Sequence, residues 1–280
     1  MKLYCAGRIV TPISEPVLLR WKINRLWSYY AVRNKVDEAF NLDRENGTAF
    51  LDSGAFSALT QGCDIDLEEY IDYLHAVDPA VGYAAALDVI GDFDATQRNY
   101  ERMACEDFRF PIYSTIHFPA TREQICRAVD SLKWPYLAIG GLVPIATRGN
   151  TLRDFLDYVW RAIRRHKENI RVHCFGITRP DVLMAYPFYS ADSTAGLVNA
   201  SRFGKLMRYP RGRQVAIDVN NDDPCGWTLR RIIYKEILGR GDVDYVTRNY
   251  MRVIANARDW LKYELFITEL WRRRGVVWGA

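Results

Sequence analysis

Several residues suited to acid–base or nucleophilic chemistry stand directly after short apolar runs. They are Asp52, Asp88, His117 and Asp192. Two carboxylates in one site can divide the work of a displacement at a sugar carbon, one as nucleophile and the other as acid and then base. An aspartate after a strand is often only a helix cap or a turn former, so each position alone argues little. The prediction depends on the whole set meeting in one place.

A glycine pair offers another kind of contact. Gly140 and Gly141 follow the apolar run at residues 136–139. Because glycine tolerates unusual dihedral angles and lets a ligand approach the main chain, this pair is able to present backbone N–H groups to a planar substrate. A plain turn is the ordinary alternative, just as a lone histidine is more often a hydrogen-bonded core residue than a catalyst.

These side chains can act together only if the fold brings the ends of the runs to one edge. Short β-rich runs alternate with amphipathic stretches, which is typical of βα units and a parallel sheet. The expected strands are residues 3–5, 49–51, 83–87, 112–115, 136–139, 172–175, 188–191 and 215–219. Helices are expected at 67–76 after the cap Asp66, and at 151–167, where Thr151 and Asp154 fit a capping box.

This order of elements predicts an α/β fold, a (β/α)8 barrel of the TIM type. A chain of 280 residues accommodates eight strand–helix units, and no Pro/Gly/Ser-rich linker divides it. We therefore expect one domain over residues 1–280, with a basic, helical C-terminal portion. In such a barrel the active site forms at the C-terminal ends of the strands, which is where the polar residues and the glycine pair stand.

The composition indicates a soluble cytoplasmic protein. Hydrophobic residues make up 49% of the chain and charged residues 26%, and there is no long apolar run of membrane-spanning type. The apolar stretch at residues 1–5 is too short for a signal peptide and fits a first strand. No membrane partner is expected.

Cysteine usage points the same way. The six cysteines lie at positions 5, 63, 105, 126, 174 and 225, with no Cys-x-x-Cys pair and no histidine at metal-ligand spacing. We interpret them as buried, reduced thiols. Neither a disulfide nor a metal site is predicted.

Positive charge is concentrated near the C-terminus. Residues 199–280 hold 16 Lys and Arg against 9 Asp and Glu, whereas the preceding residues hold 22 against 25. The basic residues nearest to Asp192 are Arg202, Lys205, Arg208, Arg211 and Arg213. Clustered cations of this kind suit the phosphates of a nucleic acid, and Tyr209 among them is able to stack on a base. A solvated basic surface is the alternative.

Three segments resemble the signature segments of the tRNA-guanine transglycosylase superfamily, and in the same order. They are Leu-Asp-Ser-Gly-Ala-Phe-Ser at 51–57, Ala-Ile-Gly-Gly-Leu at 138–142 and Tyr-Ser-Ala-Asp-Ser-Thr at 189–194. The segment Phe-Gly-Ile-Thr at 175–178, followed by Pro180, is also similar, and the resemblance covers residues 49–195. The short chain and the Asp-Ser-Gly-Ala-Phe-Ser variant look most like phage-type enzymes that place 7-deazaguanine derivatives into DNA.

The resemblance implies a role for each matching residue. Asp192 would be the nucleophile, forming a covalent aspartyl-glycosyl intermediate, and Asp52 the general acid/base. The base would contact Asp88, His117, Gly140, Gly141 and Leu142, with Ser53 and Phe56 also at the substrate. His117 departs from the family, which uses a glutamine on the carbonyl of the base, although histidine can also donate there.

A second departure from the family bears on whether the partner is DNA or tRNA. The tRNA enzymes of the family carry a structural zinc site of the form Cys-x-Cys-x-x-Cys with a distant histidine, and this sequence lacks it. That absence favours DNA as the partner, together with a free 7-deazaguanine base and no cofactor, in the host cytoplasm if a phage encodes the chain. The alternatives are a zinc-free tRNA-guanine transglycosylase, a barrel glycosidase, which the glycine pair argues against, and a catalytically inert nucleic-acid-binding protein.

Overall fold

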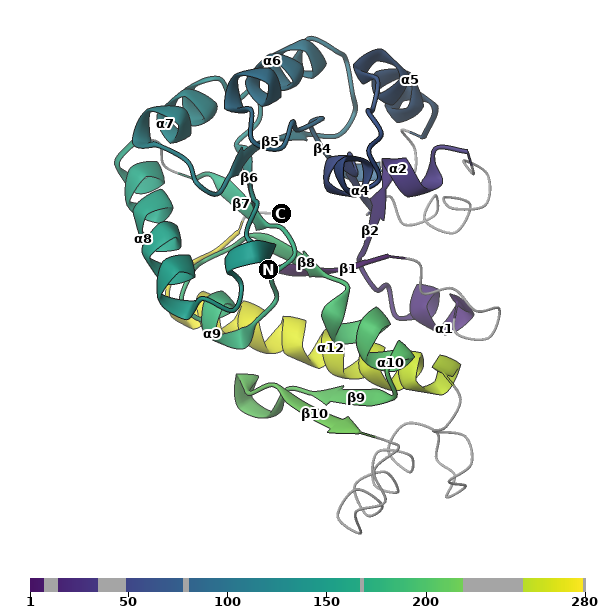
Figure 1. The fold of residues 1–280 in the computed structure, drawn as a ribbon. Helices are drawn as coiled ribbons and strands as arrows, with labels where there is room; N and C mark the ends of the chain where they lie inside the picture. Colours follow the sequence, from purple (N-terminus) through teal and green to yellow (C-terminus); the bar gives the residue numbers. More distant parts are fainter. Residues whose placement is uncertain (8–14, 35–48, 78–80, 167–168, 219–248, 279–280) are drawn as a thin grey trace.

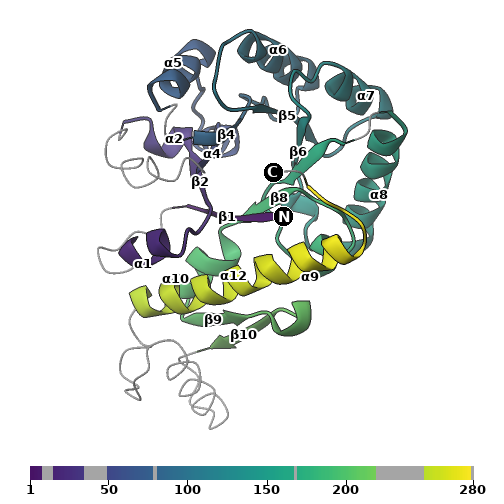
Figure 2. The same cartoon turned by 180° about the vertical axis from the view of Figure 1, so that it is seen from behind.

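The chain folds as a closed barrel of eight parallel strands, arranged in chain order with β8 beside β1. The computed structural model describes residues 1–7, 15–34, 49–77, 81–166, 169–218 and 249–278. The barrel strands are β1 (Lys2–Ala6), β2 (Arg25–Ser28), β3 (Ala49–Asp52), β4 (Val81–Ala85), β5 (Ile112–His117), β6 (Tyr136–Gly140), β7 (Arg171–Cys174) and β8 (Ser190–Ser193). Figures 1 and 2 show the strands ringed by helices. The predicted TIM-type barrel is confirmed.

Helices cover the outside of the barrel between successive strands (Figure 1). They are α1 (Glu15–Arg20), α2 (Tyr29–Val32), α4 (Ala55–Thr60), α5 (Leu67–Val77), α6 (Phe93–Ala104), α7 (Arg122–Asp130), the 3-10 turn η2 (Val143–Ile145), α8 (Gly149–His166) and α9 (Pro180–Leu183). Helix α5 begins where predicted, because the Asp66 carboxylate accepts a hydrogen bond of 2.9 Å from the Glu69 amide. Helix α8 begins at Gly149, so the predicted capping box is wrong, since Thr151 lies inside the helix.

Aromatic side chains occupy the interior of the barrel. Tyr4, Phe50 and Tyr113 are fully buried there. The ring centroids of Tyr4 and Phe50 are 5.4 Å apart, and those of Phe50 and Tyr113 are 5.1 Å apart. Aromatic side chains bury large areas and prefer such tilted contacts. This packing fills the interior of the barrel with aromatic side chains.

The eighth strand is not the predicted one. Residues 215–218 form β10 (Val215–Asp218), which pairs antiparallel with β9 (Lys205–Arg208) outside the barrel; position 219 lies outside the described residues. The barrel has no gap to receive it, because β8 already pairs with β1, Asp192 opposite Tyr4. The missing strand is β2, which sequence patterning overlooked because it is short and begins with an arginine. Strand β4 also lies two residues earlier than predicted.

Beyond β8 the chain packs against the barrel as an additional layer. It forms the π-helical turn η3 (Ala195–Asn199), α10 (Ala200–Arg202), β9, the 3-10 turn η4 (Pro210–Gly212), β10 and α12 (Asn249–Arg273). Figures 1 and 2 show α12 lying between the barrel and the β9–β10 hairpin. Trp260 of α12 donates to the Leu3 carbonyl at 3.2 Å, and the Asn256 side chain accepts from the Met207 amide at 2.7 Å. The long helix thus connects the hairpin to β1.

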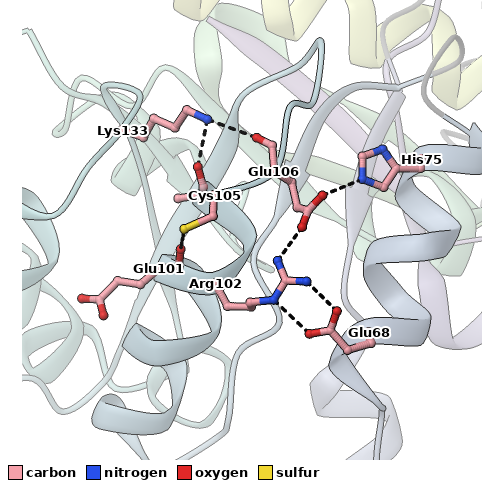
Figure 3. A network of polar contacts seen from close by, with 8 residues as sticks. Glu68, His75, Glu101, Arg102, Cys105, Glu106 and Lys133 are labelled. Carbon is pink, nitrogen blue, oxygen red and sulfur yellow. Dashed lines mark hydrogen bonds and ion pairs between the residues drawn. The ribbon is translucent and has the colours of Figure 1, made fainter.

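On the opposite side of the molecule an exposed polar network joins α5 to α6 (Figure 3). Arg102 binds Glu68 and Glu106, and His75 lies 3.0 Å from Glu106. Exposed ion pairs of this kind are screened by solvent and contribute little to the stability of a fold. We therefore regard the network as a surface feature.

The structure also tests the predicted burial of the cysteines. Cys5 and Cys174 are buried and Cys126 is half-buried, but Cys63 and Cys105 are exposed, so the prediction of buried thiols is wrong for those two. The sixth cysteine, Cys225, lies outside the described residues. The five described cysteines form no disulfide. Within the described ranges, no helix has the length and apolar character needed to cross a membrane.

Candidate active site

A cavity of about 610 Å³ opens at the C-terminal ends of the barrel strands. Asp52, Asp88, His117, Gly140 and Asp192 all line it. These residues come from the ends of β3, β5, β6 and β8 and from the loop after β4. The expectation that they meet in one place is confirmed, while the role of each stays a prediction. A cavity of this size at this end of a barrel is the usual location of a ligand site.

Asp52 ends β3 and begins a sharp turn. Its Oδ2 accepts a hydrogen bond of 3.2 Å from the Gly54 amide. Gly54 has a left-handed φ of 79°, and a Cβ there would lie 2.3 Å from Ser28 Oγ, so only glycine fits this turn. Burial, reinforced by the negative charges of Asp88 and Asp192, raises the pKa of the Asp52 carboxyl well above its ordinary value. Asp52 is therefore suited to carrying a proton.

Asp88 is held by two side chains. Ser53 Oγ donates to Oδ1 at 2.7 Å, and His117 Nε2 lies 2.8 Å from Oδ2. Ser53 is fully buried and is not among the residues lining the cavity, so the structure places it behind Asp88 rather than at the cavity surface. The carboxylate and the imidazole of His117 remain at the surface of the cavity, where they present acceptor and donor groups side by side.

The glycine pair lies beside His117. A Cβ on Gly140 would stand 2.9 Å from His117 Cδ2, closer than side chains normally approach, so the absence of a side chain makes room for the imidazole. Gly141 has a left-handed φ of 69°, and a Cβ there would meet the Phe118 backbone at 3.0 Å. Leu142 also lines the cavity, although its side chain is buried. The segment thus brings main chain directly to the cavity wall.

Asp192 lies in β8, and Oδ1 receives two polar contacts. The Gly176 amide donates to it at 3.0 Å, and His173 Nε2 lies at 3.2 Å. His173 Nδ1 in turn lies 2.8 Å from Ser190 Oγ. Residues 172–175 fit a strand in the sequence, but the pattern does not single out this fully buried histidine. The missed signal was an imidazole inside the otherwise apolar run at residues 172–175.

Strand β2 supplies cavity residues that sequence analysis also missed. Arg25, Trp27 and Ser28 line the cavity. Arg25 is buried, and its guanidinium lies 5.8 Å from the centre of the Trp27 ring. At the rim, the predicted contact residue Phe56 does line the cavity, with 58% of the residue exposed. The site therefore combines carboxylates, one buried cation and aromatic surface.

The five basic residues predicted to bind a nucleic acid are not among the residues lining the cavity. They lie in the layer beyond β8, on α10, β9 and the segment around η4. Arg208 forms an ion pair of 3.3 Å with Asp259 of α12. Arg202, Lys205, Arg211 and Arg213 are exposed.

The described residues contain no group of three or more His, Cys, Asp or Glu side chains arranged to hold a metal ion. The site thus consists of carboxylates, imidazoles and main-chain groups at the mouth of a TIM-type barrel. This defines a class of fold and a kind of site, not an individual family.

Comparisons with known proteins also identify the fold but no family. No family model matches the sequence, and no curated protein matches it. A putative fructose-1,6-biphosphate aldolase from Coccidioides immitis is similar in structure, with a TM-score of 0.57 and 11% identity, over 96% of this chain and 92% of that one. The YdjI aldolase from Escherichia coli K12 has a TM-score of 0.52 and 12% identity, over 95% and 90%. At such identities the likeness establishes the barrel fold alone.

Proposed function

We propose that this chain is an enzyme, a base-exchange transglycosylase that replaces guanine in DNA by a 7-deazaguanine derivative. The observation that carries the proposal is the placement of Asp52 and Asp192 in one cavity, in unlike surroundings. Asp52 has a raised pKa, whereas Asp192 accepts hydrogen bonds from a main-chain amide and faces an imidazole. Unlike surroundings for two carboxylates separate an acid from a nucleophile. The resemblance of residues 49–195 to the transglycosylase superfamily supplies the reaction.

The reaction consists of two displacements at the same carbon. An oxygen of Asp192 attacks C1′, and the bond from C1′ to guanine N9 breaks with its electron pair going to the base, which takes a proton from Asp52. The incoming base then gives a proton to Asp52 and attacks C1′ through N9. The ester bond to Asp192 breaks, and its electron pair returns to the carboxylate. Two displacements retain the configuration of the sugar.

The remaining cavity residues suit recognition of a purine. Asp88 accepts hydrogen bonds and so fits the amino edge of the base, and His117 beside it fits the carbonyl oxygen. The main chain at Gly140 and Gly141 lies close enough for contacts with a flat ring. Because C1′ is inaccessible inside a stacked duplex, the target nucleotide must be flipped out or single-stranded, which costs a few kcal/mol. Exposed Phe56 at the rim is positioned to stack on a displaced base.

The test is a base-exchange assay with three polymers. Duplex DNA, single-stranded DNA and tRNA are incubated separately with the protein and labelled guanine or 7-deazaguanine bases. We expect label to enter DNA, and Asp192→Asn to abolish both incorporation and a covalent protein–DNA band on denaturing gels. The matched control is Asp94→Asn, which removes a carboxylate from an exposed ion pair with Arg127 outside the cavity.

The outcomes separate the alternatives. Incorporation into tRNA alone would replace DNA as the partner. A covalent band that persists in Asp192→Asn would show that another residue is the nucleophile. Absence of incorporation into every polymer, with DNA still bound after loss of both carboxylates, would refute the enzyme and leave a binding protein.

A further inference from the structure

His173 is a buried polar side chain in direct contact with the proposed nucleophile Asp192, yet no role follows for it from the sequence. It is fully buried on β7, and its ring stacks on Phe50 at 4.6 Å and meets Phe175 edge-on at 4.5 Å. A buried imidazole needs partners for both nitrogens, since an unsatisfied buried polar group is costly. His173 has them, in Ser190 Oγ at 2.8 Å and Asp192 Oδ1 at 3.2 Å.

The partners determine which nitrogen carries the proton. A nucleophilic carboxylate is ionised and only accepts hydrogen bonds, so with Asp192 in that form the contact requires a proton on His173 Nε2. The serine hydroxyl can donate as well as accept, so Ser190 is able to donate to Nδ1. The aromatic rings around the imidazole hold its plane in place. Ser190, His173 and Asp192 thus form a buried chain of hydrogen bonds that ends at the proposed nucleophile.

We propose that His173 is a positioning residue that donates from Nε2 to Asp192 Oδ1, stabilises the ionised carboxylate, and so promotes release of the sugar in the second displacement. The Gly176 amide contacts the same oxygen. When the other oxygen, Oδ2, is bonded to C1′, Oδ1 is the carbonyl oxygen of an ester and carries less charge. When the C1′–Oδ2 bond breaks, its electron pair returns to the carboxylate, and both donors stabilise that charge.

This inference rests on the proposed function and makes a prediction that general damage to the fold would not produce. Donors on Oδ1 stabilise the carboxylate more than the ester, because hydrogen bonds to charged acceptors are stronger. Removing one therefore favours the ester, by on the order of 10- to 100-fold in the carboxylate–ester equilibrium. The covalent adduct should accumulate, since its reaction with the incoming base slows more than its formation.

The kinetic test uses His173→Phe, which keeps a ring in the aromatic cage but removes both nitrogens. Adduct formation on labelled DNA is followed without free base, and its disappearance is followed after addition of base. Tyr4→Phe is the matched control. The Tyr4 ring lies 6.1 Å from the His173 ring, and the substitution removes a buried hydroxyl without altering the contact between His173 and Asp192. We expect slower disappearance and a larger adduct fraction in His173→Phe only. Equal slowing of both steps, or no change in either, would overturn the proposal.

A second measurement needs no substrate and so separates this inference from the proposed function. Nitrogen-15 NMR of protein labelled at its four histidines reports the protonated ring nitrogen, and the spectrum of His173→Phe assigns the signal. We expect His173 to be protonated at Nε2, and Ser190→Ala to shift its Nδ1 signal. Protonation at Nδ1 alone would refute the donor role even if the enzyme exchanges bases. Protonation at Nε2 with no adduct in the wild type would leave the hydrogen bond in place and refute the reaction.

Discussion

Replacing Gly140 by alanine tests whether His117 takes part in recognising the base. The added Cβ would lie 2.9 Å from His117 Cδ2 and 3.2 Å from Nε2, whereas ordinary contacts begin at 3.4 Å. The imidazole must therefore move by about 0.5 Å or rotate, because interiors are too closely packed to absorb the overlap elsewhere. The φ of Gly140 is not in the left-handed region, so alanine introduces no backbone strain.

Moving the imidazole weakens the hydrogen bond between His117 and Asp88. His117 Nε2 is 2.8 Å from Asp88 Oδ2, and a displaced ring loses that geometry and its alignment toward the cavity. Hydrogen bonds that involve a charged group contribute about 1.5–3 kcal/mol. We therefore expect Gly140→Ala to raise the KM for the free base on the order of 10- to 100-fold, since each 1.4 kcal/mol is tenfold.

The assay measures base incorporation into DNA at varied concentrations of free base, with Gly149→Ala as the matched control. Gly149 is the first residue of α8, and a Cβ added there would meet no atom within 4 Å, so an alanine fits without obstruction. Polymer binding should be unchanged in both variants. If His117→Ala raises the KM but Gly140→Ala does not, the steric argument is wrong. If neither does, His117 does not bind the base.

Two further predictions concern pH and salt. The pKa of the Asp52 carboxyl is raised by burial, so its contribution to stability is present below the ordinary carboxyl pKa and is lost as pH rises through the raised value. Asp52→Asn should therefore raise Tm more at pH 8 than at pH 4. An equal rise in Tm at both pH values would contradict burial as the cause. Replacing the exposed Lys205, Arg211 and Arg213 by alanine should weaken DNA binding and flatten its salt dependence without changing the KM for free base, whereas an unaltered salt slope would place the phosphate contacts elsewhere.

Sequence patterning predicts this barrel well because its strongest signal is repeated. Buried runs such as residues 112–116 and 136–140 recur at intervals typical of a βα array, and polar residues at their C-terminal ends mark the mouth of the barrel. Errors occur where the pattern is short. The four residues of β2 begin with Arg25, whose charge disguises a strand that is buried over most of its length. Residues 215–218 look like a strand and are one, but their partner is β9.

The partners of the functional side chains are harder to predict than their positions. Asp88 and His117 are 29 residues apart, and nothing in the sequence indicates that they bind each other. Ser53 resembles a substrate contact because it stands beside Asp52, yet alternation along the chain directs it behind the cavity, where it donates to Asp88. Such pairings depend on the register between neighbouring strands, which periodicity alone does not specify.

The roles proposed for Asp52 and Asp192 differ because the surroundings of the two carboxylates differ. Both follow apolar runs and both reach the same cavity, so the sequence makes them look alike. Desolvation and the charges of two other carboxylates favour the protonated form of Asp52, whereas Asp192 Oδ1 accepts a hydrogen bond from an amide and lies beside an imidazole. His173 can supply that difference only because β7 and β8 are neighbours, with His173 opposite Ser190. The strand order of the barrel thus gives the two carboxylates different neighbours, and their proposed roles depend on that difference.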